Sequence, residues 1–178
     1  MQTKFPYLYS LPLKKLRHYA NGAAMKYAPV EVYLLCLFHL CIGISAFAGG
    51  GSLMLEPDGS LLGLKIELLK HSPFANYFIP GLILFFLVGI FPLIILFGLL
   101  FKPPWKIFDV FNIYKDRHGA WAYSLYCGII TLAWIIFQQV MVTYFWIQPL
   151  IALAGLFIII FSLLPSVMKF YQLGNPDK

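Results

Sequence analysis

Hydrophobic residues in this chain occur in four long runs separated by shorter polar segments. The runs cover residues 30–48, 77–101, 120–142 and 149–168. Each is near the length that a helix needs to cross the hydrocarbon core, because a helix rises about 1.5 Å per residue and about 20 residues are required. Backbone polar groups inside a bilayer must be satisfied within the protein, which favours helices. The pattern predicts an all-α membrane protein, a four-helix transmembrane bundle spanning residues 30–168.

Composition supports a surface that faces lipid. Hydrophobic residues make up 61% of the 178 residues, and charged residues make up 11%. Soluble domains carry roughly 25% charged residues, so this chain has too few to cover a water-exposed surface. The formal net charge of +6 could indicate nucleic-acid binding in a soluble protein. Here the basic residues lie between the apolar runs, and we interpret them as determinants of membrane topology.

Lysine and arginine are distributed unequally between the two sides of the predicted bundle. The segments 1–29, 102–119 and 169–178 together hold eleven, whereas the segment 49–76 holds two. Cytoplasmic segments are enriched in basic residues. We therefore expect an inner (plasma) membrane protein with a cytoplasmic N-terminal segment and tail, and with 49–76 as its outer loop. Aromatic residues at the run boundaries agree with this orientation: Trp105 and Trp121 inside, and Tyr77, Tyr144 and Trp146 outside.

Two of the cytoplasmic segments have the pattern of helices that lie in the membrane interface. Apolar residues repeat at helical spacing through residues 11–27, with basic residues on the other faces. A similar pattern follows Pro103 and Pro104 in the segment 102–118. Basic faces of this kind contact anionic headgroups. We expect both segments to anchor the bundle.

The outer loop contains recognisable turn chemistry. Gly49, Gly50 and Gly51 are expected to end the first helix. The sequence Glu56-Pro57-Asp58-Gly59 is a turn signal, because proline presets φ and glycine accepts positive φ. The segment following it predicts either a short β-hairpin or an irregular reversal packed on the helix ends. Residues 65–71 predict a short amphipathic helix, and Asn76 or Ser72 is expected to cap the second run.

One alternative changes the number of spans. Ala46-Phe47-Ala48 resembles a signal-peptidase site after an apolar run. The run is longer than a typical signal-peptide core, and 29 residues precede it. We therefore favour an uncleaved first span.

The loop sequence GGGSLMLEPDGSLLGLKIELLKHSPFANYFIPG, residues 49–81, resembles a pattern in a family of small four-span bacterial membrane proteins of uncharacterised function. That pattern combines a glycine-rich end of the first span, an aspartate-glycine turn, SPF, a tyrosine and PG at the start of the second span. A weaker similarity occurs at WIIFQQ in the third run. The resemblance implies a bacterial origin and a four-span fold, and it implies no activity.

Few residues could carry chemistry within the bilayer. His39 lies near the middle of the first run, where an ionisable group is a candidate for function. It has neither an HxxxH nor a Glu-x-x-His partner, and a metal site would need further ligands. No cofactor motif, zinc signature or catalytic motif occurs, so no catalytic residue, cofactor or metal is assigned. The residues chosen as a candidate polar pocket are His39, Gln138, Asn76, Asp58 and Glu56.

A competing interpretation places the same polar residues in a helix–helix seam. Small or polar residues recur at helical spacing along the third run, at Ser124, Gly128, Thr131, Ile135 and Gln138. Such a stripe lets helices approach closely. The first run, with His39, Gly43 and Ser45, is its expected partner. Pro92 lies inside the second run, where it is expected to kink the helix.

Three functions remain open at this point. The first is a non-enzymatic bundle that binds a lipid or another membrane protein. The second is a small membrane enzyme acting on a lipid or isoprenoid, and the third is a channel or transporter subunit. The absence of an evident inverted repeat weakens the transporter hypothesis.

Overall fold

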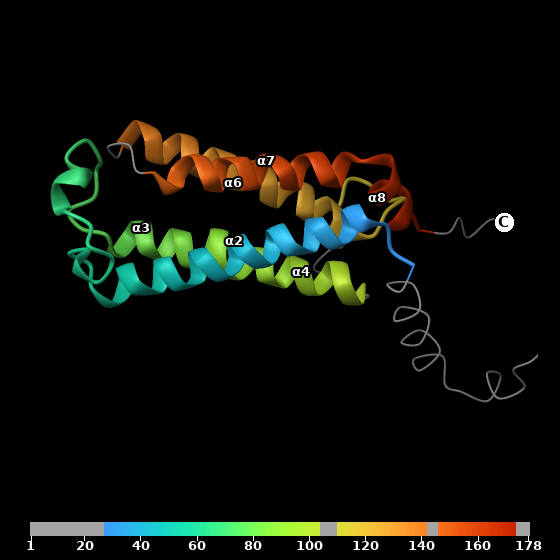
Figure 1. Cartoon of the computed structure of the whole chain (residues 1–178), viewed down its shortest axis with the longest axis horizontal. Coiled ribbons are helices and arrows are strands. Elements are labelled where there is room, and N and C mark those ends of the chain that lie inside the picture. Colours follow the sequence, from blue (N-terminus) through green and yellow to red (C-terminus); the bar gives the residue numbers. More distant parts are fainter. Residues whose placement is uncertain (1–26, 104–109, 142–145, 174–178) are drawn as a thin grey trace, which may run out of the picture.

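The computed structural model describes residues 27–103, 110–141 and 146–173. Every regular element in these ranges is helical. The long elements are α2 (Val30–Leu55), a rod of α3 (Phe78–Ile83), η4 (Leu84–Ile90) and α4 (Phe91–Phe101), then α6 (Gly119–Met141) and α7 (Ile147–Leu163). The short ones are the 3-10 helices η2 (Ser60–Leu62) and η3 (Ile66–Leu69), and α8 (Pro165–Phe170). The long elements lie alongside one another, with residues 56–77 at one end and α8 at the other (Figure 1).

Three helices of the described residues are long and apolar enough to cross a membrane. They are Val30–Leu55, Phe78–Phe101 and Gly119–Val140. The fourth apolar helix, α7, has 17 residues and is shorter than the run that predicted it. It ends where Leu164 adopts an extended ψ of 136°. Proline disfavours the helical conformation in the residue before it, so Pro165 breaks the predicted span 149–168 and starts α8.

The first helix does not end at its three glycines, which corrects the expected boundary at residue 48. α2 continues to Leu55. The reason is close packing: a Cβ placed on Gly50 would lie 2.6 Å from the backbone nitrogen of Phe85 and 2.7 Å from the carbonyl oxygen of Gly81. A Cβ on Gly89 would likewise lie 2.8 Å from the backbone nitrogen of Phe47. Glycine here allows α2 and the α3–η4 rod to touch backbone to backbone.

The second rod is irregular just before its internal proline. Residues Leu84–Ile90 form a π-helix, and α4 begins at Phe91 with Pro92 in its first turn. Proline lacks the N–H that would bond to the carbonyl four residues earlier. The helical hydrogen bonding therefore changes just before Pro92, as in other π segments inside longer helices, and the expected kink stays a prediction.

The polar and small-residue stripe of α6 faces α7, and the expected pairing with the first helix is wrong. Ser124 Oγ lies 3.0 Å from Ser162 Oγ. A Cβ on Gly128 would lie 2.9 Å from the carbonyl oxygen of Gly155, and one on Gly155 would meet Thr131 at 3.1 Å. Gly155 and Ser162 are about two helical turns apart in a run that is otherwise apolar, so the sequence of α7 gave little indication of its role.

Two of the aromatic residues expected at the membrane boundary are buried against the rest of the protein. Trp121 is 1% exposed and Tyr77 is 4% exposed. Trp146 is exposed, as a boundary residue would be. Trp105, Tyr144 and residues 11–26 of the expected N-terminal interfacial helix lie outside the described residues, as does the central part of the one expected in 102–118.

Candidate functional site

A cavity of about 580 Å³ lies at the end of the molecule that carries residues 56–77. We call it the loop-end cavity. Its walls come from the second half of α2, from Pro80 to Val88, from the last turns of α6 and from the first turns of α7, and the loop covers it. The side chains that bring polar atoms to this otherwise apolar lining are Cys41, Ser45, Tyr77, Trp134, Gln138, Trp146 and Gln148. No Asp, Glu, Lys, Arg or His is among its lining residues in the described part of the chain.

Tyr77 holds the loop over the cavity. Its backbone N–H donates to the carbonyl of Pro57 at 2.8 Å, and its hydroxyl donates to the carbonyl of Lys65 at 2.7 Å. Its ring packs with Leu53 of α2 and Leu69 of η3 in a small apolar cluster. Burial, with a smaller contribution from the charge of Glu67, raises the pKa of Tyr77. The hydroxyl keeps its proton at neutral pH and donates it to the Lys65 carbonyl.

The loop contains 3-10 helices, so of its two expected forms the irregular reversal is present and the β-hairpin is not. Gly59 adopts a φ of +85°, and its N–H bonds to the carbonyl of Glu56 at 3.0 Å. Asp58 Oδ1 accepts from the N–H of Ser60 at 3.0 Å, and the bonds from Ser60 lower the pKa of Asp58. The Ser60 hydroxyl also lies within hydrogen-bond distance of Asp58 and Glu56. Both carboxylates thus serve the turn, and neither lines the cavity.

The N-cap residue of the second rod is Tyr77 and has no side-chain cap, so the expected capping by Ser72 or Asn76 is wrong, although Asn76 bonds to the first residue of the helix. The Asn76 Oδ1 accepts from the N–H of Phe78 at 3.0 Å. Ser72 instead accepts from the N–H of Phe74 at 3.3 Å. Like the two carboxylates, Asn76 is not a lining residue.

His39 is fully buried and lies outside the cavity lining. Its Nδ1 is 2.9 Å from the carbonyl oxygen of Leu35, one turn earlier in α2. Because a carbonyl can only accept, Nδ1 carries the proton in this arrangement, and Nε2 is the bare nitrogen. Nε2 has no hydrogen-bond partner among the described residues. His39 therefore packs as a neutral side chain, and of the five candidate residues Gln138 alone lines the cavity.

Sequence reasoning did not single out two of the polar groups in the wall. Trp134 is 8% exposed and Gln148 is 3% exposed. Tryptophan is common in apolar segments, so its role could not be seen. Gln148 could have been noticed, because it is a lone amide at the start of an otherwise apolar run.

The described residues offer no evident site for a metal ion. They contain no group of three or more His, Cys, Asp or Glu side chains placed to hold a metal ion. The cysteines Cys36, Cys41 and Cys127 are not in disulfides.

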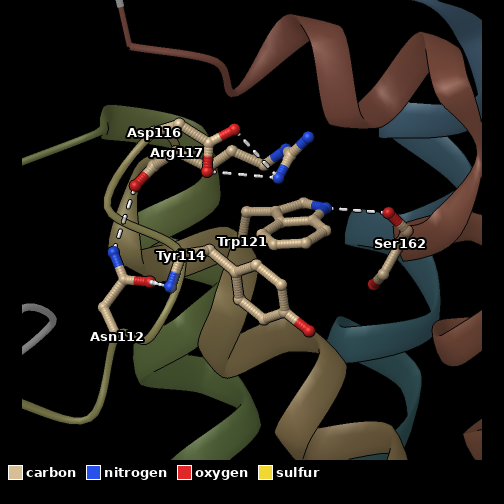
Figure 2. Close-up of polar contacts among 6 residues, drawn as sticks. All are labelled: Asn112, Tyr114, Asp116, Arg117, Trp121 and Ser162. Carbon is tan, nitrogen blue, oxygen red and sulfur yellow. Dashed lines mark hydrogen bonds and ion pairs between the residues drawn. The ribbon is translucent and has the colours of Figure 1, made fainter.

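The opposite end of the molecule is closed by a polar cluster around Trp121 (Figure 2). The indole N–H of Trp121 donates to the carbonyl of Ser162 at 2.7 Å, which ties α6 to α7. The Arg117 guanidinium lies 5.0 Å from the Trp121 ring and 3.1 Å from the carboxylate of Asp116. Asn112 donates to the carbonyl of Arg117 at 3.1 Å. These contacts connect α6 to α7 and to the segment that precedes α6.

Lys102 closes the same end from α4. Its ammonium donates to the carbonyl of Phe170 at 3.1 Å and lies 3.6 Å from the centre of that ring. Burial lowers the pKa of Lys102 to about 8. The ring face and the carbonyl favour the charged amine and oppose this effect in part.

The Lys102 amine should titrate near pH 8 rather than near its ordinary value of 10.5. Reductive ¹³C-methylation followed by NMR titration measures this, and a Lys102→Arg variant assigns the signal. Between these two pH values the unfolded chain binds more protons than the folded one, so stability should rise with pH. A midpoint above 10 would contradict the buried placement of Lys102.

Comparison of the chain with protein-family models, curated proteins and solved structures finds no match. The geometry of the loop-end cavity therefore carries the functional argument. An apolar cavity with a few uncharged polar groups can hold an apolar ligand and orient it.

Proposed function

We propose that this chain is a bacterial inner-membrane protein that crosses the bilayer four times and binds a lipid in the loop-end cavity without catalysing a reaction. Three helices have the length and hydropathy of spans. α7 has 17 residues, about 25 Å of helix, which is at the short end of the range for a span. It packs against α2 and along α6, and α8 extends the rod at the basic end.

The proposed orientation places α8 and the start of α2 in the cytoplasm. Lys102, Lys115, Arg117 and Lys169 belong to this end, and the positive-inside rule supports that side. The loop then faces outward, with the cavity just beneath it at the outer edge of the bilayer.

The main support for lipid binding is the apolar lining of the loop-end cavity. Its volume of about 580 Å³ lies within the range of small-molecule sites. An apolar wall of this kind stabilises hydrocarbon but offers little to a water-soluble, charged substrate. Because the helices around it are membrane spans in this proposal, the most abundant apolar molecules nearby are lipids.

Native mass spectrometry of the full chain released from nanodiscs tests this proposal. Ala154 lines the cavity and Ala48 faces outward on α2 without lining it. The wild-type chain and Ala48→Phe should retain a lipid, whereas Ala154→Phe should retain roughly ten times less because the ring fills the cavity, a loss equivalent to about 1.4 kcal/mol of binding free energy. A wild-type chain that is stripped as easily as Ala154→Phe would contradict lipid binding at this site.

A further inference from the structure

The loop-end cavity opens sideways, between α2 and α7. The lining residues on this side are themselves exposed. On α2 these are Cys41 and Ser45. On the other helix, Leu150 is 54% exposed, and Trp146, just before α7, is 61% exposed. On the opposite side, Val88 lines the cavity and is fully buried. In a membrane-embedded molecule the exposed side faces lipid, so a ligand would enter from the bilayer.

The cavity has an apolar floor. Below its lining, Phe38 of α2 stacks on Phe157 and Phe161 of α7, with ring centroids 5.2 and 5.7 Å apart. These rings join α2 to α7 and close the space between them. Figure 1 shows that α6 and α7 come closer to α2 toward the end that carries α8. A chain entering between the helices would therefore end against aromatic rings.

The polar side chains lie above this floor and carry no charge. Gln138 is in the last turn of α6 and Gln148 is in the first turn of α7. Ser45 donates its hydroxyl proton to the carbonyl of Cys41 at 2.6 Å, which leaves its oxygen as an acceptor only. Trp134 is nine-tenths buried, and its indole N–H has no acceptor among the described residues. A buried N–H without an acceptor destabilises the folded protein unless another molecule supplies the acceptor.

We infer that the ligand is an uncharged lipid whose carbonyl oxygen accepts from the Trp134 indole N–H and the Gln138 amide, with its apolar tail directed to the Phe38 floor. This inference rests on the proposed lipid site. A carbonyl supplies the acceptor that the indole lacks, and it needs no cation. A phosphate-bearing lipid would bring a negative charge next to a lining with no Lys, Arg or His in the described part of the chain.

Two chemical sources could supply such a carbonyl: an ester of a neutral glycerolipid or the ring of a prenylated quinone. Both share the acceptor and the long tail. The uncharged lining argues against a charged lipid but does not favour one type of carbonyl over the other. The experiment below therefore has to distinguish the two sources.

The test uses the full chain in phosphatidylcholine nanodiscs doped separately with dioleoylglycerol, a long-chain quinone or phosphatidylglycerol. Native mass spectrometry measures which additive is retained. Retention of dioleoylglycerol or the quinone in preference to phosphatidylglycerol supports the inference and identifies the source of the carbonyl. Preferential retention of phosphatidylglycerol overturns the inference but leaves the proposed function standing. Retention of no lipid overturns both.

A second readout addresses the indole N–H directly. Trp134→Phe keeps an aromatic wall and removes the donor, so retention of the neutral lipid should fall about 3- to 10-fold. The matched control is Phe137→Leu, which changes an aromatic side chain on the same helix at an exposed position outside the lining and should leave retention nearly unchanged. In the wild-type chain labelled with ¹⁵N-tryptophan, the Trp134 indole signal should move downfield when the neutral lipid is added. Unchanged retention in Trp134→Phe, or an unmoved indole signal with lipid bound, would refute the assigned hydrogen bond.

Discussion

Replacing Gly50 by alanine is expected to destabilise the protein by about 1–3 kcal/mol, at the upper end of that range. The added Cβ would lie 2.6 Å from the backbone nitrogen and 2.8 Å from the Cα of Phe85, and 2.7 Å from the carbonyl oxygen of Gly81. Backbone atoms of a packed helix cannot rotate away as a side chain can. α2 and the α3–η4 rod would have to separate, and the apolar contacts beside the contact point would weaken with them.

The neighbouring glycine provides the matched control. A Cβ on Gly51 would meet only the Phe85 ring, at 3.6 Å, which is ordinary contact. Gly51→Ala should therefore be neutral or should stabilise the helix by up to about 1 kcal/mol, because alanine favours the helical backbone. Unfolding in mixed detergent micelles, followed by circular dichroism, measures both variants. If the two variants had equal stability, the close approach of α2 to the second rod would be refuted.

Truncating Trp121 to alanine is expected to cost about 3–5 kcal/mol. The side chain is fully buried, packs at right angles to Tyr114 with ring centroids 5.1 Å apart, and holds α7 through the carbonyl of Ser162. The variant would leave a large cavity, an unsatisfied carbonyl and an Arg117 guanidinium without its ring. The same denaturation series should show this loss as the largest among the tryptophan variants at described positions.

Trp146→Ala serves as the comparison, because Trp146 is 61% exposed. Its loss should change stability by less than about 1 kcal/mol, as expected for surface substitutions away from packed sites. A Trp121→Ala protein as stable as Trp146→Ala would mean that the cluster in Figure 2 does not join α6 to α7.

The helices and their approximate places were predictable because hydropathy directly reflects the solvent around a segment. Which helices touch was less predictable. The stripe containing Gly128 and Thr131 was correctly recognised as a seam, but its partner is α7 and not α2. A stripe of small residues indicates that another helix packs closely against it, but it does not identify that helix. The glycines at 49–51 were misinterpreted for a related reason: a helix end and a close helix contact both require the small residue.

The candidate site was predictable only in part. Gln138 stood out as an amide in an apolar run, and it lines the cavity. His39 stood out for the same reason, yet it is satisfied at Nδ1 by its own helix and buried away from the lining. The cavity is lined by residues of α2, the second rod, α6 and α7, which are far apart in the sequence. Their arrangement depends on tertiary packing, and no local pattern in the sequence encodes it.

The number of membrane crossings is tested most directly by thiol labelling in intact cells. Single cysteines at Leu61, Lys115 and Leu173 occupy exposed positions in the loop, between α4 and α6, and after α8. The unsubstituted chain serves as background, because Cys36 and Cys127 are buried and Cys41 lies in the middle of α2, a helix long and apolar enough to cross a membrane. With a membrane-impermeant reagent, four crossings predict labelling of Leu61→Cys in intact cells, and of Lys115→Cys and Leu173→Cys only after permeabilisation. Labelling of Leu173→Cys together with Leu61→Cys in intact cells would show three crossings and contradict the account.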